Sequence, residues 1–170
     1  MTCDICEIFK HKEIFKVVYE DDLCLAILHE SPANYGHTLV MPKEHFTIME
    51  LVPDKIIEHL FTIANMISTA LFETLNLQGT NVVVNNGVEA GQKDPHFVIN
   101  IIPRTENDGI NFEWKAEPAN EDNLKTAELK LKEFGIQMAP KEEKEPMKVE
   151  EHIEQVDDED YMFKQLRKIP

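Results

Sequence analysis

Positive charge, cysteine and long apolar runs are all scarce in this sequence of 170 residues. Lysine and arginine number 17 against 32 aspartates and glutamates, so the formal net charge is −15. Such a charge repels nucleic-acid backbones and anionic lipid, which disfavours non-specific binding to nucleic acid. No apolar run reaches the roughly 18 residues that a membrane span needs, and the first residues form no basic-then-apolar leader. We therefore expect a cytoplasmic protein with no membrane partner.

Cysteine is limited to Cys3, Cys6 and Cys24. An odd number of cysteines in a chain without an export signal argues against a disulfide framework, so reduced thiols or metal ligands are expected. The length and the hydrophobic content of 42% suit one domain, which at this size buries roughly 70% of the surface of its unfolded chain. A second full domain is not expected.

The composition changes at residue 141. Residues 141–160 contain ten acidic residues and three lysines, with too few apolar side chains to offset the entropy of ordering, so they predict an acidic linker. Residues 161–170 regain apolar and basic side chains and predict a docking peptide that could bind a protein partner. We divide the chain into a domain over residues 1–115, a C-terminal helix packed on it within residues 116–140, the linker and the terminal peptide.

Short β-branched runs and one strong helical pattern make up the predicted domain. Apolar residues at helical spacing predict a helix of about six turns that starts at Asp54 and continues until Gly79. A second amphipathic pattern predicts a helix from Glu121 to Phe134. Strands and helices do not alternate regularly, which indicates an α+β domain around an antiparallel sheet whose first two strands form a hairpin. The predicted strands cover residues 15–19, 23–28, 37–41, 80–85 and 96–102.

The last predicted strand, residues 96–102, has two different faces. Successive strand residues point to opposite faces, so His96, Val98 and Asn100 are predicted to share one face. The opposite face is apolar, and we expect it to join the core. Its residues are Phe97, Ile99 and Ile101.

Four short motifs follow one another along the chain: Cys3-Asp4-Ile5-Cys6; Gly36-His37-Thr38 with Pro42-Lys43-Glu44-His45; Asn85-Asn86-Gly87 with Gly91-Gln92; and His96 to Arg104. In this order and spacing they resemble the histidine triad (HIT) family, in particular its zinc-containing archaeal and bacterial members. The resemblance runs to about Trp114 and implies a HIT-like fold, with a five-stranded antiparallel sheet, one long helix and a C-terminal helix. It also implies hydrolysis or transfer of nucleoside monophosphates, and a homodimer formed through the apolar face of the helix over residues 54–75.

The strand motif of the family has three alternating histidines, and the resemblance places them at positions 96, 98 and 100. These positions read His96, Val98 and Asn100. In the family the middle histidine is the nucleophile that attacks phosphorus, and Val98 has no lone pair with which to do so. Asn100 can hydrogen-bond but cannot act as a general acid or base near neutral pH. We therefore expect no catalytic residue of the usual kind and no nucleotidylated histidine.

The resemblance also implies a structural zinc site made by Cys3, Cys6, His45 and His96. Two thiolates and two imidazoles complete a tetrahedral zinc site, which would hold the amino terminus against the last strand. Two free thiols and two unrelated histidines are the alternative. A thioredoxin-like motif is disfavoured because no strand precedes the two cysteines.

The remaining motifs imply ligand-binding residues. Asn85, Gly91 and Gln92 match the family loop that meets phosphate and ribose, and His37 matches the histidine of a Gly-His-Thr motif. Asn100, whose amide could hydrogen-bond, is the fifth expected ligand-binding residue. A simple turn is the alternative for the loop, since asparagine and glycine tolerate positive φ. Aligning Ser31-Pro32 with the family turn puts His29 where an aspartate commonly binds the ribose hydroxyls.

Three functional hypotheses remain open. The first is a protein that binds a purine nucleotide or another phosphate ligand without the usual hydrolysis. The second is a nucleotide hydrolase or phosphoramidase that uses another group, such as His29 or His37, as its nucleophile. The third is a zinc-stabilised interaction module that binds a protein partner through residues 141–170. The other histidines, His11, His59 and His152, are predicted to lie on the surface.

Overall fold

The computed structural model describes residues 3–135. The chain divides into two compact units, residues 1–110 and 111–170, and the described part of the second unit carries helix α3 (Glu121–Gly135). The packing of this helix on the first unit stays a prediction. The predicted linker and docking peptide lie outside the described residues, as does His152.

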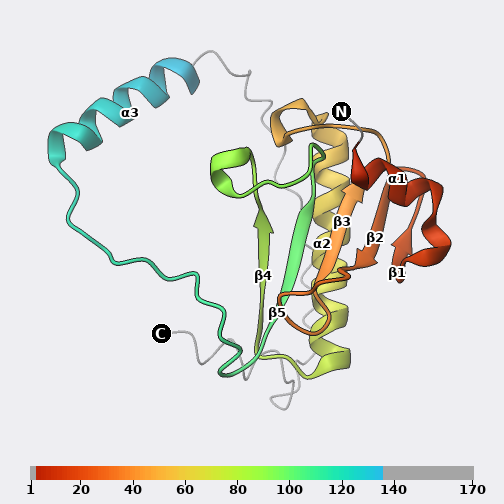
Figure 1. Ribbon diagram of the computed structural model, residues 1–170. Coiled ribbons are helices and arrows are strands. Elements are labelled where there is room, and N and C mark those ends of the chain that lie inside the picture. The colour runs from red at the N-terminus through yellow and green to blue at the C-terminus, as the bar shows by residue number, and fades with distance from the viewer. Residues whose placement is uncertain (1–2, 136–170) are drawn as a thin grey trace, which may run out of the picture. The chain divides into compact units, whose positions relative to one another are not determined.

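A five-stranded sheet forms the centre of the first unit (Figure 1). Its strand order is β1-β2-β3-β5-β4, and every neighbouring pair is antiparallel. With the helices described below, it confirms the predicted α+β fold. The strands are β1 (Val17–Glu20), β2 (Cys24–Leu28), β3 (Thr38–Pro42), β4 (Gly79–Val84) and β5 (Ile99–Arg104).

Helix α2 (Asp54–Leu75) lies along one face of the sheet (Figure 1). It begins directly after Pro53, with the carboxylate of Asp54 in the first turn, where the helix dipole favours negative charge. It ends at Asn76, whose left-handed backbone (φ 52°) closes the helix. The predicted stop at Gly79 is therefore late, because Gly79 already opens strand β4.

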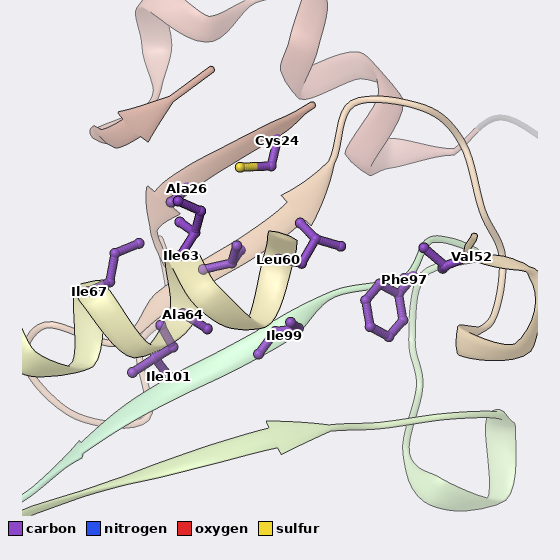
Figure 2. Packing of buried hydrophobic residues seen from close by; sticks show 11 residues of the cluster. Cys24, Ala26, Val52, Leu60, Ile63, Ala64, Ile67, Phe97, Ile99 and Ile101 are labelled. Atoms are coloured by element: carbon purple, nitrogen blue, oxygen red, sulfur yellow. The ribbon is translucent and has the colours of Figure 1, made fainter. Parts of the chain in front are cut away.

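The apolar face of α2 packs on the sheet, as Figure 2 shows for Leu60, Ile63, Ala64 and Ile67. Full burial of a leucine or isoleucine contributes about 1.5–3 kcal/mol, so this packing is a main source of stability. Because these side chains are buried against the sheet, they are not available to a second subunit. The prediction that the apolar face of this helix forms a dimer interface was therefore wrong. The homodimer itself stays a prediction. The strand residues that meet α2 are Cys24, Ala26, Val40, Ile99 and Ile101.

Strand β5 begins at Ile99, whereas the sequence predicted a start at His96. Pro42 of β3 has no N–H to donate, and β4 ends at Val84, so the ladder stops on both sides of β5. Side chains nevertheless alternate between the two faces of the sheet in the residues just before the strand. Phe97 is 2% exposed and belongs to the core beneath α2 (Figure 2).

The opposite face of the sheet is called the α1 face, because helix α1 (Asp4–Lys10) covers part of it. Ile5 of this helix is buried, and Val98 is half-buried against the same cluster. Helix α1 was not predicted from the sequence, because its seven residues are too few to show a periodic pattern. The cluster under α1 contains Cys3, Ile5, Leu25, Ile27 and Met41.

Short 3-10 helices occur in three of the connections: η1 (Lys12–Ile14), η2 (Met49–Leu51) and η3 (Val88–Ala90). Within residues 3–135, no helix combines the length and the apolar character required to span a membrane.

Asp21 ties the turn between β1 and β2 to helix α2. Its Oδ1 accepts the backbone N–H groups of Leu23 and Cys24, both at 2.8 Å. Its Oδ2 accepts the Tyr19 hydroxyl at 2.9 Å and the Nε2–H of His59 at 2.7 Å. His59 was predicted to lie on the surface; its imidazole is half-buried there and holds α2 to the hairpin.

These contacts lower the pKa of Asp21. Burial acts to raise it, but hydrogen bonds from Cys24, His59, Leu23 and Tyr19 outweigh burial and hold the pKa well below its usual value. A carboxyl with a depressed pKa in the folded state stabilises the fold above its ordinary pKa near 4. That stability is lost as the pH falls through the folded-state value.

We expect Asp21→Asn to lower the free energy of unfolding at pH 7 by about 2 kcal/mol, the scale of hydrogen bonds to a charged acceptor. The variant should also show a weaker loss of stability between about pH 5 and pH 2. Thermal unfolding followed by circular dichroism measures both effects. Some acid sensitivity should remain, because Arg104 holds the pKa of Asp108 well below its usual range. Equal acid sensitivity of the two proteins would contradict the role given to Asp21.

Candidate functional site

Four side chains with metal-binding atoms converge beside α1. Cys3 precedes the first residue of α1 and Cys6 lies within it, while His45 follows β3 and His96 precedes β5. Their donor atoms all lie within 4.8 Å of one another. Cys6 Sγ is 3.2 Å from His45 Nδ1, and Cys3 Sγ is 3.6 Å from His96 Nδ1. The structure thus brings together all four residues predicted as metal ligands.

The hydrogen bonding of His96 leaves one ring nitrogen available to a metal. Its Nε2 lies 3.0 Å from the carbonyl oxygen of Pro42, which can only accept, so Nε2 carries the proton. The lone pair is then on Nδ1, the atom that faces Cys3 and Cys6. Burial lowers the pKa of His96, which favours the neutral ring that binds metal. A metal-binding histidine typically has such an outer hydrogen bond.

The two thiols complete a donor set that suits zinc. Partial burial, and then the neighbouring Cys3 thiol, raise the pKa of Cys6. A divalent cation between the sulfurs would reverse this effect by stabilising both thiolates. Two sulfur and two nitrogen donors match the ligand set of tetrahedral structural zinc sites.

A second group of potential donors, Asp21, Cys24 and His59, also lies within 4.8 Å. Both carboxylate oxygens of Asp21 already accept two hydrogen bonds each. Cys24 is fully buried, and burial raises its pKa to about 12, so the thiolate that would bind a metal is strongly disfavoured. This group therefore has a structural role.

Gly36 positions the predicted ligand residue His37. Its φ is +87°, and an added Cβ would lie 2.7 Å from Leu75 Cδ1 and 3.3 Å from Pro103 Cγ. Only glycine fits this close approach of the loop to the end of α2. The loop then enters β3 with the His37 side chain on the α1 face, beside Asn100.

His37 and Asn100 form a chain of hydrogen bonds. The N–H of Ala33 donates to His37 Nδ1 at 3.2 Å, so the proton of His37 is on Nε2. That Nε2–H donates to Asn100 Oδ1 at 3.1 Å, and Asn100 Nδ2 donates to the Val83 carbonyl at 3.4 Å. Both predicted ligand residues therefore make hydrogen bonds within the protein.

His29 lies directly over His37, with ring centroids 4.8 Å apart and an interplanar angle of 29°. The N–H of Ser31 donates to His29 Nδ1 at 2.9 Å, which places its proton on Nε2. That Nε2–H has no hydrogen-bond partner in the described part of the chain. His29 thus presents a donor and no free lone pair.

Gln92 holds the loop between β4 and β5. Its Oε1 accepts the Gly87 N–H at 2.8 Å, and its Nε2 donates to the carbonyls of Thr47 at 2.7 Å and Asp94 at 2.9 Å. Gly91 closes the same loop with φ +85°. The side chain of Gln92 is therefore directed into the loop, and its contacts support a positioning role.

Asn85 differs from the other predicted ligand residues. Its side chain is exposed at the end of β4 and makes no hydrogen bond with any residue of the 3–135 range. Val83, two residues earlier, is paired with Asn100, so Asn85 follows the strand edge beyond that pair. Its amide is available to an incoming acceptor.

Comparison with known proteins identifies the family of this chain. The family model described as the HIT domain matches residues 12–107, which is more than half of the chain. This chain belongs to the HIT family. The match includes His45 and His96, whereas Cys3 and Cys6 lie before it.

Individual HIT proteins support the same relationship. The chain is 35% identical over 123 residues to the adenylylsulfatase HINT3 of Arabidopsis thaliana, which covers 72% of this chain and 61% of the relative. A histidine triad nucleotide-binding protein from Candida albicans matches with a TM-score of 0.72 and 26% identity, covering 81% of this chain and 100% of its own. A zinc-bound family member from Mycobacterium smegmatis matches with a TM-score of 0.61 and 28% identity, covering 80% and 97%. The chain thus spans less than two thirds of the plant relative.

We expect Gln92→Glu to lower the free energy of unfolding by about 2 kcal/mol, because a carboxylate oxygen would replace the donor that faces the carbonyls of Thr47, Asp94 and His96. Thermal unfolding measures the loss, and faster hydrogen exchange at the Gly87 amide locates it in the loop. Asn85→Asp is the matched control: the same amide-to-acid change at an exposed side chain should alter stability by less than about 0.5 kcal/mol. Equal effects of the two changes would refute the positioning role.

Proposed function

We propose that this HIT protein binds a nucleoside monophosphate or a related phosphate ligand on the α1 face and does not carry out the usual hydrolysis. The observation that carries the proposal is the state of the imidazoles on this face. His29 and His37 both accept a backbone N–H at Nδ1, and each therefore has its proton on Nε2. The position that the family resemblance gives to the nucleophile is Val98.

A neutral imidazole has one lone pair, and attack on phosphorus requires it to be free. In His29 and His37 that lone pair is directed at a backbone amide, so neither ring has a nucleophilic nitrogen in this arrangement. This argues against the alternative that one of them replaces the missing nucleophile. Cys24 and His96 are also unsuitable as nucleophiles, because Cys24 is buried with a pKa of about 12 and His96 faces the two thiols.

The loop after β4 offers groups that can bind a phosphate. The exposed amide of Asn85 can donate to a phosphate oxygen, and Gly91 lies beside it, where a larger residue would approach the Asn85 amide. The names of the relatives support the ligand class, since one is an adenylylsulfatase and another a nucleotide-binding protein. An adenine nucleotide is therefore the first ligand to test.

We also infer that Cys3, Cys6, His45 and His96 hold one structural zinc ion. The convergence of the four donors and the Nδ1 lone pair of His96 support this assignment. The zinc-bound family member from Mycobacterium smegmatis supports zinc over other metals. Zinc would supply no step of a reaction here, because all four of its positions are taken by protein ligands. Its role would be to hold α1 on the sheet.

We expect the protein to contain one zinc ion per chain, and Cys6→Ser to release it and lower Tm by about 10 °C. Metal analysis and thermal unfolding measure the two effects. Cys24→Ala is the matched control: removing this buried core thiol should lower stability while leaving the zinc content unchanged. Metal-free wild-type protein with undiminished stability would rule out the site.

Adenosine monophosphate should bind with a Kd on the order of 1 mM, and Asn85→Asp should weaken binding about tenfold through charge repulsion. Isothermal calorimetry measures both constants. Asn65→Asp, which adds the same charge at an exposed position of α2, should leave the affinity unchanged. Absence of saturable binding at millimolar concentration would overturn the proposal.

Turnover provides the second arm of this test. Hydrolysis of adenosine phosphoramidate should not exceed that of buffer, and Val98→His should not restore full activity. Asn100 cannot deliver a proton to the leaving group, and general acid catalysis contributes about 10²- to 10⁴-fold. Hydrolysis by the wild-type protein that His37→Ala abolishes would favour the enzyme hypothesis.

A further inference from the structure

His29 and His37 form the last backbone contact between β2 and β3. The N–H of His29 donates to the carbonyl of His37 at 2.9 Å, directly beyond the pair Leu28 and Thr38. Thr38 is fully buried, whereas His37 reaches Asn100 on the α1 face. The two imidazoles therefore project together from the same edge of the α1 face, and their rings stack there.

One donor of this pair is unused. The Nε2–H of His37 is taken by Asn100, and the Nδ1 of His29 is taken by the N–H of Ser31. The Nε2–H of half-buried His29 has no acceptor among residues 3–135. Stacking and the Ser31 contact hold the ring in place, so this N–H is an oriented donor for an oxygen of a ligand.

The electrostatics of the pair favour an anion. Burial lowers the pKa of His37, and the proximity of His29 lowers it further, because two stacked imidazolium ions would repel each other. A negative group beside the rings would offset this repulsion and make a charge-assisted hydrogen bond with His29. A neutral sugar hydroxyl would not provide that compensation.

The available donors lie on both sides of Asn100. Leu39 of β3 and Val83 of β4 are both paired with Asn100. His37 and His29 lie beyond Leu39 on one side, and Asn85 lies beyond Val83 on the other. A ligand that lies over Asn100 would therefore meet one anion-binding donor at each end.

We propose that His29, positioned by His37, binds a second phosphate group carried on the ribose 2′ or 3′ oxygen of the ligand. The protein would then select nucleoside bisphosphates over monophosphates. This inference rests on the proposed function, which assigns the 5′ phosphate to the region of Asn85. His29 is the specificity-determining residue, and His37 acts through it.

Calorimetry with four adenine nucleotides tests the inference. Adenosine 2′,5′-bisphosphate or adenosine 3′,5′-bisphosphate should bind about tenfold more tightly than adenosine monophosphate, the effect of one charge-assisted hydrogen bond. Adenosine diphosphate carries its extra phosphate on the 5′ side and serves as the control for added ligand charge. It should bind no more tightly than the monophosphate.

A pair of variants assigns the effect to His29. His29→Asp should abolish the preference for the bisphosphate, because its carboxylate would repel the second phosphate. His11→Asp makes the same chemical change at an exposed histidine and should retain the preference. Lys12, the neighbour of His11, pairs with Glu20 at the end of β1 that is farther from His29. Titration followed by ¹H–¹⁵N NMR of the unmodified protein should shift the His29 Nε2–H signal with the bisphosphate.

The outcomes separate the two proposals. Binding of the monophosphate without a preference for either bisphosphate would overturn the role of His29 and leave the proposed function standing. An equal gain for adenosine diphosphate would also overturn it, because the gain would then reflect charge alone. Absence of binding by all four nucleotides would overturn both.

Discussion

The hydrogen bond from His96 Nε2–H to the carbonyl of Pro42 controls the geometry of the metal-type site. Pro42 cannot donate to β5, so the strand ladder stops there, and its free carbonyl accepts the imidazole proton instead. The bond fixes the tautomer of His96 and directs Nδ1 toward the thiols of Cys3 and Cys6. Cys6 lies in α1, and this helix covers part of the face on which the candidate ligand residues lie.

On the α1 face, hydrogen bonds within the protein engage the ring nitrogens that a nucleophilic histidine would need. Backbone amides occupy the Nδ1 lone pairs of His29 and His37, and Asn100 takes the remaining proton of His37. An imidazole nitrogen that accepts a backbone N–H cannot at the same time be a free nucleophile. The same bonds orient the rings and leave the Nε2–H of His29 without an acceptor among the described residues.

Local patterns predicted the fold well where a segment buries one continuous face. The helix that begins at Asp54 and the antiparallel strands were confirmed because their spacing reflects packing on one core. Errors occurred where a contact distant in sequence decides the boundary. The start of β5 depends on Pro42 of another strand, and α1 is too short to show a period without the sheet that it covers. Nothing in the sequence indicated that His59, predicted on the surface, contacts Asp21, because the two residues are 38 positions apart.

The sequence by itself determined the chemical inventory: four sulfur and nitrogen donors in a family pattern, a valine at position 98, and the amides of Asn85 and Gln92. Only the tertiary structure decided how these groups are used. It brought the four donors within 4.8 Å, directed Gln92 into its own loop and left Asn85 free among the described residues. Residue type fixes how many protons and lone pairs a side chain has. The backbone carbonyl or amide that engages each of them is a property of the fold, because every residue carries a carbonyl and the sequence does not mark which one will be near.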